Sequence, residues 1–190
     1  TRKLLTGLDV AALADMGWQV TPGSGLTSPT ILLAALAPNS LVISDNATPN
    51  DGISQYTING DPPIEFDTTT SDIFIAGGGQ ADTIEFSSLD GQFSGDIFVN
   101  GGSGDDLLDV DYSLSDTFTY NGEGGNDSLA LQGATATQVG HTFFNASDGS
   151  ISVDAASPAA LFYTGLEPID DLIAATSRVF TFFDTADVIT

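Results

Sequence analysis

Short runs of apolar and β-branched residues alternate with glycine, aspartate, asparagine and serine from about residue 31 onward. Runs of this kind, bounded by turn-forming residues, are typical of β-strands. Three of them share one phrase, in which a strand is followed by a glycine-rich turn and a second strand. The three copies span residues 71–84, 95–108 and 115–129. A repeated strand–turn–strand unit predicts an all-β chain built from similar coils.

The spacing within and between the three copies is nearly regular. The apolar residue after the turn lies ten residues beyond Phe74 and Phe98 and eleven beyond Phe118, and these phenylalanines are 24 and 20 residues apart. A unit of this size cannot bury both faces of its strands, whereas stacked units pair each strand with its copy in the next coil. We therefore predict a parallel β-helix, a solenoid with about 20–24 residues per coil.

Stacking in this register predicts two columns of inward apolar side chains. The two columns are Phe74, Phe98, Phe118 and Ile84, Leu108, Leu129. An antiparallel sandwich with glycine-rich hairpins is the alternative fold, although a sandwich does not require the same phrase three times in register.

The two ends of the chain differ from the repeated region. Residues 1–20 place apolar residues at helical spacing and predict a short helix, either a cap of the solenoid or the end of an upstream domain. Residues 21–30 are rich in Pro, Gly, Ser and Thr and predict a linker. Residues 31–190 form the predicted solenoid. Another strand–turn–strand unit begins near residue 180 and is cut short, so we expect the solenoid to continue beyond the C-terminus or into the next subunit.

The charge of the chain is strongly negative. Its 26 acidic residues outnumber three basic ones, which gives a formal net charge of −23. Nucleic acid and anionic membrane surfaces are disfavoured as partners, because no basic patch is available to meet phosphate. No apolar run approaches the ~18 residues of a membrane span, so we expect no membrane insertion. The absence of cysteine excludes disulfides and thiolate metal sites.

Stacking also places aspartates above one another in two columns. One column would contain Asp82, Asp106 and Asp127, and the other would contain Asp72, Asp96 and Asp116. Aspartates separated by one strand spacing repel strongly unless cations compensate them. A glycine turn that presents carboxylates and carbonyls favours calcium, which accepts six to eight oxygen ligands. We therefore predict calcium as the cofactor.

The best-preserved turn is GGSGDDLLD, residues 101–109, which has every defined position of the nonapeptide G-G-x-G-x-D-x-U-x, where U is a large apolar residue. Residues 77–85 and 122–130 are near matches, with Gln80 and Glu123 in place of glycines. These motifs resemble the repeats-in-toxin calcium-binding proteins, as found in large bacterial surface proteins. The resemblance implies an extracellular bacterial protein.

The same resemblance implies which groups bind calcium between successive coils. The implied side-chain ligands are Asp82, Asp106 and Asp127, and the implied carbonyl ligands lie near Gly78, Gly102, Ser103 and Gly104. The family's β-roll carries its nonapeptides in tandem, with turns on both edges. Here one nonapeptide occurs in each longer coil, so calcium is expected along one edge of a wider β-helix.

A second resemblance lies at the start of the chain. Residues 1–20 resemble the closing helix of secreted bacterial metzincin-type metalloprotease domains. The matching residues are Leu8, Asp9, Leu13, Asp15, Gly17 and Trp18. The resemblance implies a protease core upstream of Thr1. The zinc signature H-E-x-x-H is absent from the chain itself, whose only histidine is His141.

Three functional hypotheses follow, and the first is preferred. In the first, the chain is a non-catalytic extracellular module, stiffened by calcium into a rod, fibre or surface layer. Its open ends would pair end to end with another copy or with neighbouring repeats of a larger chain. In the second, it is a calcium-dependent secretion and folding module of a metalloprotease. In the third, it is a β-helix that binds or cleaves carbohydrate. No catalytic constellation is evident, so we expect no enzyme activity.

Overall fold

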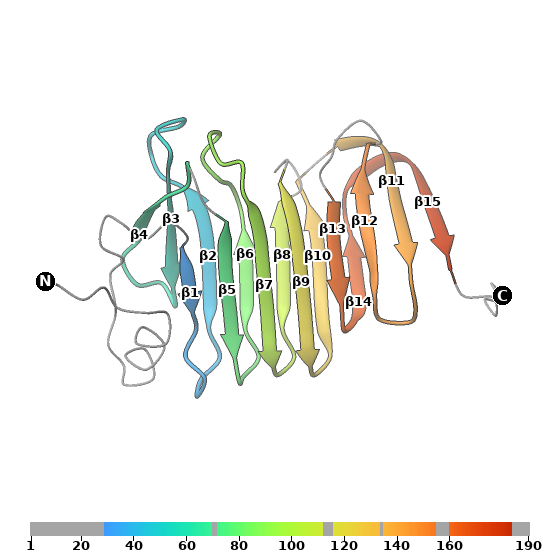
Figure 1. Ribbon diagram of the computed structural model, residues 1–190, viewed down its shortest axis with the longest axis horizontal. Helices are drawn as coiled ribbons and strands as arrows, with labels where there is room; N and C mark the ends of the chain where they lie inside the picture. The colour runs from blue at the N-terminus through green and yellow to red at the C-terminus, as the bar shows by residue number, and fades with distance from the viewer. Residues whose placement is uncertain (1–28, 70–71, 112–115, 134, 155–159, 184–190) are drawn as a thin grey trace, which may run out of the picture.

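The computed structural model describes residues 29–69, 72–111, 116–133, 135–154 and 160–183, and their strands form two facing sheets (Figure 1). All regular structure in these ranges is β-strand, so the predicted all-β class is confirmed. The described residues include no helix that could cross a membrane. The helix predicted for residues 1–20 lies outside the described ranges, as does most of the linker at 21–30.

Sheet A has eight strands and sheet B has seven. In spatial order, sheet A contains β1 (Thr30–Leu32), β5 (Ile73–Gly78), β7 (Asp96–Ser103), β9 (Thr117–Gly124), β13 (Ala160–Thr164), β12 (Gly149–Val153), β11 (Thr135–Phe143) and β15 (Ala174–Phe182). Sheet B contains β14 (Leu166–Asp171), β10 (Asp127–Gln132), β8 (Leu107–Asp111), β6 (Thr83–Phe86), β2 (Ser40–Asp45), β3 (Ile53–Ile58) and β4 (Ile64–Asp67).

Five pairs of strands, each with one strand in sheet A and the next in sheet B, repeat along the molecule. They are β1–β2, β5–β6, β7–β8, β9–β10 and β13–β14, and each pair is called a coil below. Every strand of a coil is parallel to its equivalent in the adjacent coil. The three central coils are the three copies of the repeated phrase.

Parallel pairing does not continue through both sheets. In sheet B, β3 and β4 extend the edge beyond β2 as an antiparallel ladder. In sheet A, β12 and β11 add two antiparallel pairings beyond β13, and β15 then pairs in parallel with β11. The prediction of parallel coils throughout is therefore wrong at both ends, where inserted hairpins extend the sheets.

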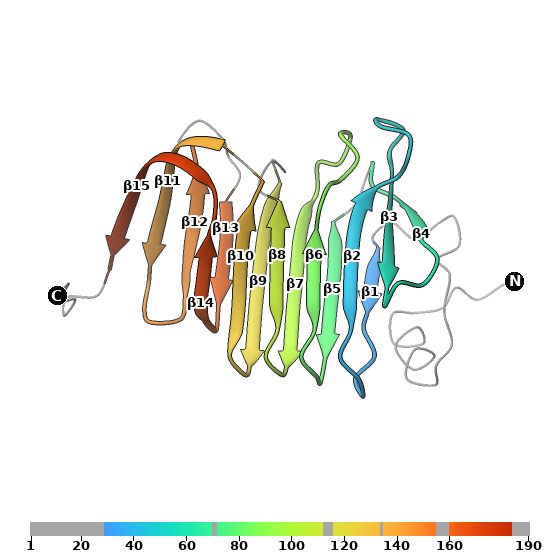
Figure 2. The same ribbon diagram turned by 180° about the vertical axis from the view of Figure 1, so that it is seen from behind.

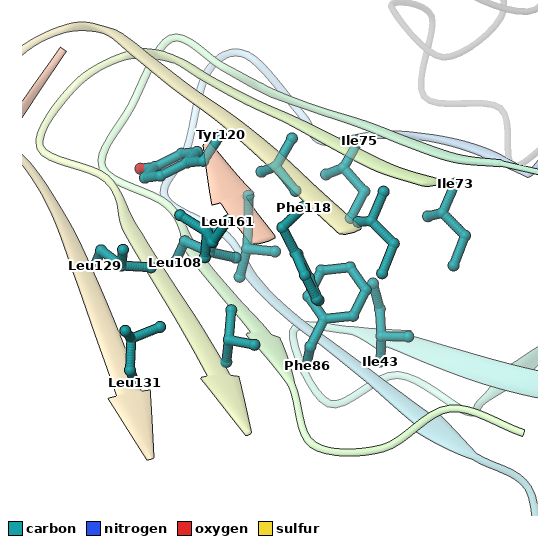
Figure 3. Packing of buried hydrophobic residues seen from close by; sticks show 14 of the residues in the cluster. Ile43, Ile73, Ile75, Phe86, Leu108, Phe118, Tyr120, Leu129, Leu131 and Leu161 are labelled. Atoms are coloured by element: carbon teal, nitrogen blue, oxygen red, sulfur yellow. The ribbon is translucent and has the colours of Figure 1, made fainter. Parts of the chain in front are cut away.

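The hydrophobic core lies between the two sheets, and Figure 3 shows its central side chains. The predicted column of Ile84, Leu108 and Leu129 is confirmed, because these residues pair in register and are at most 1% exposed.

The second predicted column is wrong by one residue. Ile97 lies opposite Ile73 and Phe118, and all three point into the core. Phe74 and Phe98 occupy the next position along their strands, so they face outward. The spacing that unites the three copies is eleven residues, from Ile73 to Ile84 and equivalently in the other two coils, instead of the ten counted from Phe74.

Candidate metal centre at the glycine–aspartate turns

The turns that join the two strands of each coil lie along one edge of the molecule, at the bottom of Figure 2. The three nonapeptide motifs form the turns β5–β6, β7–β8 and β9–β10. Their second positions, Gly78, Gly102 and Glu123, pair in register across the strands. The equivalent positions of the three motifs are thus neighbours in space.

Asp82, Asp106 and Asp127, which follow these turns, form a column of buried carboxylates, each at most 1% exposed. The backbone N–H of Asp82 donates to Asp106 Oδ1 at 2.7 Å, and the backbone N–H of Asp106 donates to Asp127 Oδ1 at 2.9 Å. One oxygen of each carboxylate therefore satisfies a backbone donor at the edge of the adjacent coil. This explains why an acidic side chain can be buried here.

Two further residues extend the column to all five coils. Asn39 donates to Asp82 Oδ1 through its backbone N–H at 2.7 Å and through Nδ2 at 2.8 Å. At the other end, the backbone N–H of Asp127 donates to Glu167 Oε2 at 3.3 Å. The sequence interpretation missed both residues. The signal for Asn39 was present, because Asn39-Ser40-Leu41 has the same order of side-chain types as Asp82-Thr83-Ile84.

The other oxygen, Oδ2, of each of the three aspartates is buried and has no hydrogen-bond partner. It points at the first glycine of its motif: a Cβ atom on Gly101 would lie 2.6 Å from Asp106 Oδ2, and one on Gly122 would lie 2.5 Å from Asp127 Oδ2. The carbonyl oxygens of Gly122 and Gly165 lie 3.1 Å and 2.7 Å from the same two points. Each Oδ2 therefore shares a small space with a carbonyl of the next coil, and only glycine leaves that space open.

The electrostatics of the column favour a positive charge. Burial raises the pKa of Asp106 to about 6, the hydrogen bond from the Asp82 backbone opposes this rise, and the carboxylates of Asp127, Asp82 and Asp105 add to it. Burial likewise raises the pKa of Asp82 and of Asp127. The Oδ2 atoms of these carboxylates face carbonyl oxygens and receive no hydrogen bond. Either a proton or a cation must therefore compensate their charge.

A tyrosine lies under the same column. The Tyr120 hydroxyl, on β9, is buried without a hydrogen-bond partner. Burial raises its pKa, and the negative charges of Asp127 and Asp106 raise it further. The hydroxyl is therefore close enough to the column for its ionisation to be affected by the carboxylates.

The donor set fits a hard cation. Within the described ranges, no three His, Asp or Glu side chains gather into a metal-binding group. Each of the three turns offers one buried carboxylate, and the carbonyl groups around it would have to complete the coordination. Calcium accepts this mixture of carboxylate and carbonyl oxygens, whereas zinc prefers nitrogen and sulfur ligands.

The remaining turn residues of the sequence hypothesis also lie at this edge. Gly78, Gly102 and Gly104 have φ values of 122°, 96° and 125°, and a Cβ atom on Gly102 would lie 2.2 Å from the Gly78 carbonyl oxygen. Ser103 is exposed and lies opposite Gly124. Glu123 takes the position of the second glycine at φ 67°, a left-handed conformation that is strained for a residue with a side chain.

The second predicted column does not form as expected. The backbone N–H of Asp96 donates to Asp72 Oδ1 at 3.0 Å, so these two residues are neighbours. Asp96 lies opposite Thr117, however, and Asp116 falls one residue out of the column. The cause is the same shift that places Phe118 opposite Ile97. These aspartates lie at the first residue of a sheet A strand or directly before it, and so at the edge opposite the glycine turns, where burial raises the pKa of Asp116 to about 6.

His141 is buried and paired with an aspartate. It is 4% exposed, and its Nε2 lies 3.0 Å from Asp171 Oδ2. Asp171 also accepts a hydrogen bond from Arg178 Nε at 2.7 Å. This arrangement ties β11 to the end of β14 and to the middle of β15, and it is distant in sequence from the glycine turns.

The stretch that resembles a metzincin helix, residues 1–20, lies outside the described ranges. No protein-family model, no curated protein and no solved structure gives a significant match to this chain.

Proposed function

We propose that the chain is a non-catalytic structural module, a β-solenoid whose stacked coils are held together by calcium at the glycine–aspartate turns. The supporting observation is the column of buried, unpartnered Oδ2 atoms on Asp82, Asp106 and Asp127. Arg178 is the only Lys or Arg among the described residues, and it is bonded to Asp171. The part of the chain that the structure describes therefore provides no cationic side chain for the column.

The ligands follow from the oxygen pairs described above. The Oδ2 atoms of the three aspartates would bind the ions together with the glycine carbonyls that face them. The carbonyls near Gly78, Gly102, Ser103 and Gly104 are the further candidates. Bound calcium would supply positive charge between successive carboxylates and so join adjacent coils. The chain itself contributes the preformed oxygen cage and excludes water from it.

An extracellular, bacterial location is part of this proposal. Calcium-binding modules outside cells operate with dissociation constants of about 10⁻⁴–10⁻³ M. A chain with a net charge of −23 is destabilised by self-repulsion unless cations are abundant. The module would thus be folded in a calcium-rich medium and weakened where calcium is scarce.

We expect calcium to raise the thermal unfolding temperature of the protein. A ligand that binds only the folded state stabilises it by about 2.7 kcal/mol per site at a hundred times its dissociation constant. The test is thermal unfolding followed by circular dichroism, in excess calcium and in excess chelator. Magnesium at the same concentration is the control, because it requires a smaller and more regular ligand cage. Identical unfolding curves in calcium and in chelator would exclude the proposal.

We further propose that a second copy of the chain pairs along β15, which makes the module self-associating. Three of the four sheet edges are protected: β1 has only three residues, β4 follows two prolines and carries carboxylates, and β14 contains Pro168. β15 has nine residues without proline, and Val179, Phe180 and Phe182 on it are exposed. Long apolar edge strands of this kind readily accept another strand.

Val179→Lys is expected to shift the protein from associated species toward the monomer, because a charge on the edge strand disfavours strand pairing. The measurement is sedimentation velocity in calcium over a range of protein concentrations. Leu172→Lys is the matched control, since Leu172 is 68% exposed but precedes the strand. A wild-type protein that stays monomeric at about 100 μM, or a variant that associates like the wild type, would contradict the pairing. The calcium measurement above does not depend on this result.

A further inference from the structure

β15 is the edge strand at one end of sheet A (Figure 1). β11 pairs with it along one side, from Thr135 opposite Ala174 to Phe143 opposite Phe182. No strand of the described residues pairs with its other side, and eight of its nine residues are exposed. The backbone N–H and C=O groups along that side can therefore accept another strand.

The core of the sandwich is open beside this strand. Phe180 and Phe182 lie opposite His141 and Phe143 and stack on them, with ring centroids 5.2 Å and 5.1 Å apart. They continue the core-facing row of sheet A, because His141 is buried and lies opposite the buried Ile151. Phe180 and Phe182 are nevertheless 54% and 41% exposed. Sheet A continues for three strands beyond β13, whereas the described strands of sheet B end at β14, which leaves the end of this row uncovered.

β15 also lacks the negative charge that the rest of the molecule carries. The chain has 26 acidic residues, and none of them lies between residues 172 and 183. Arg178 is the only charged residue of the strand, and its guanidinium is bonded to Asp171 of its own chain, through Nε at 2.7 Å and through a terminal nitrogen at 3.2 Å. Two β15 strands can therefore approach each other without bringing unpaired charges together.

The other edges of the two sheets are poor partners for β15. β1, at the far end of sheet A, offers only three residues. The edges of sheet B are β4, which carries Glu65 and Asp67, and β14, which contains Pro168 next to a glutamate. A head-to-tail contact would thus be short at β1, or would place the phenylalanines of β15 beside carboxylates that need water. A contact between two β15 strands has neither disadvantage.

We propose that two copies of the chain pair isologously, β15 against β15, about a two-fold axis normal to sheet A. The proposal rests on the self-association along β15 proposed above and assigns its geometry. The two strands are then antiparallel, and the core-facing sides of both copies lie on the same side of one continuous sheet. Phe180 and Phe182 of one copy become neighbours of the same residues in the other. Because each copy has one such edge, the pair is closed, whereas a head-to-tail contact would leave an edge for every further copy.

The absence of cysteine allows a single nitroxide label to be placed at a chosen position. Pulsed electron–electron double resonance then measures the distance between the labels of two copies, with calcium present so that the fold is unaffected. Ser177→Cys and Thr181→Cys carry the label near the middle and near the end of β15. We expect a distance below about 25 Å for at least one of them, because antiparallel neighbours lie about 4.8 Å apart and residues follow one another at about 3.4 Å.

Leu36→Cys is the matched control. Leu36 is 95% exposed and lies between β1 and β2, at the other end of sheet A. Eight strands at a spacing of about 4.8 Å make the sheet about 40 Å long, so isologous pairing separates these labels by about two such lengths. A head-to-tail contact instead separates the labels by about one sheet length at all three positions.

Sedimentation velocity of the unlabelled wild type, over a range of concentrations, adds the size limit. The mass is expected to reach that of a dimer and to rise no further. Larger species, or a separation of one sheet length at all three label positions, would overturn the isologous pairing while leaving the self-association in place. A wild type that stays monomeric would overturn both, so the two failures are distinguishable. A label that itself blocks pairing does not decide the result, because the size limit is measured without it.

Discussion

Asp106→Asn is expected to stabilise the calcium-free protein and to destabilise the calcium-loaded protein. The amide retains an oxygen for the hydrogen bond from the Asp82 backbone, and it removes a charge that Asp82 and Asp127 repel. Its NH₂ group replaces an unpartnered acceptor beside the Gly122 carbonyl. A buried polar atom without a partner costs about 1–3 kcal/mol, so we expect a gain of that size in chelator.

With calcium present, the same substitution removes a charged ligand from the middle of the column. The variant should then lose more from weakened ion binding than it gains from the amide. Urea unfolding of both proteins, each in calcium and in chelator, gives the four free energies required. Asp96→Asn is the control, because Asp96 is exposed and lies on the opposite edge of the same coil. An equal gain for Asp106→Asn in both conditions would show that the column is a metal-free hydrogen-bond ladder.

The calcium-free protein is expected to become more stable as the pH falls from 7 to 5. The pKa of Asp106 is raised to about 6 in the folded state, above its ordinary value of 3.8, so the folded protein binds this proton more tightly than the unfolded chain. Its contribution to stability is therefore complete below the ordinary pKa and is lost as the pH rises through about 6. A difference of one in pKa corresponds to about 1.4 kcal/mol, so the full effect of Asp106, reached only near the ordinary pKa, is on the order of 2–3 kcal/mol, and about 1.4 kcal/mol of it falls between pH 7 and 5.

Other carboxyl groups define the pH window for this measurement. Burial raises the pKa of Asp82, Asp127 and Asp116, so these groups change stability in the same direction. Hydrogen bonds from Thr69 and Asn145 lower the pKa of Asp67 and Asp148, and these contributions are lost only as the pH falls below the ordinary value. The change in stability between pH 5 and 7 therefore reports the aspartates whose pKa is raised.

In saturating calcium the trend with pH should weaken or reverse, since protons compete with the ion for the same carboxylates. Thermal unfolding between pH 5 and 7, with chelator and with calcium, compares the two trends directly. The Asp106→Asn variant in chelator should show a smaller pH dependence than the wild type. A calcium-free unfolding temperature that stays constant over this interval would contradict the proposed state of the column.

The repeated unit of the fold could be predicted from the sequence because its side chains repeat. The glycine turn fixes where each strand pair begins, and Ile84, Leu108 and Leu129 follow it at a constant distance. The strand before the turn differs from the prediction, because the large apolar side chains of Phe74 and Phe98 favour a core position and yet face outward. Size alone does not reveal which face of a strand a residue occupies when both faces carry apolar groups.

The pairing at the two ends could not be predicted in the same way. Buried and more exposed residues alternate along β3 and β12 as they do along the parallel strands. This alternation is the same whether a strand pairs in parallel or antiparallel, so it does not reveal the direction of pairing. The length of the connection determines the direction. Short connections return the chain as an antiparallel hairpin, and parallel neighbours need a longer crossover. The segment after Asp45 contains enough residues for a hairpin of its own before the next coil begins.

The main chemistry of the turn was visible because it depends on local order. A first glycine with an aspartate five residues later brings carboxylate and backbone together in each coil separately. Glu167 was missed because it joins the column only through stacking, and Asn39 was missed because the turn before it contains no glycine. An amide and a longer acid occupy the end positions, where each has one aspartate neighbour instead of two.

The two edges of the molecule differ in how much change in chain length they can tolerate. The hairpins β3–β4 and β11–β12 both enter at crossovers from sheet B back to sheet A, opposite the glycine turns (Figure 1). They lengthen the separation between paired residues from 24, at Ile73 and Ile97, to 44, at Thr30 and Phe74. Loop closure costs only about 0.6 kcal/mol for each doubling of length. Grafted segments should therefore be accepted at this edge, while the three glycine–aspartate turns, where carbonyls and carboxylates meet within 3.1 Å of one point, leave no space for an added residue.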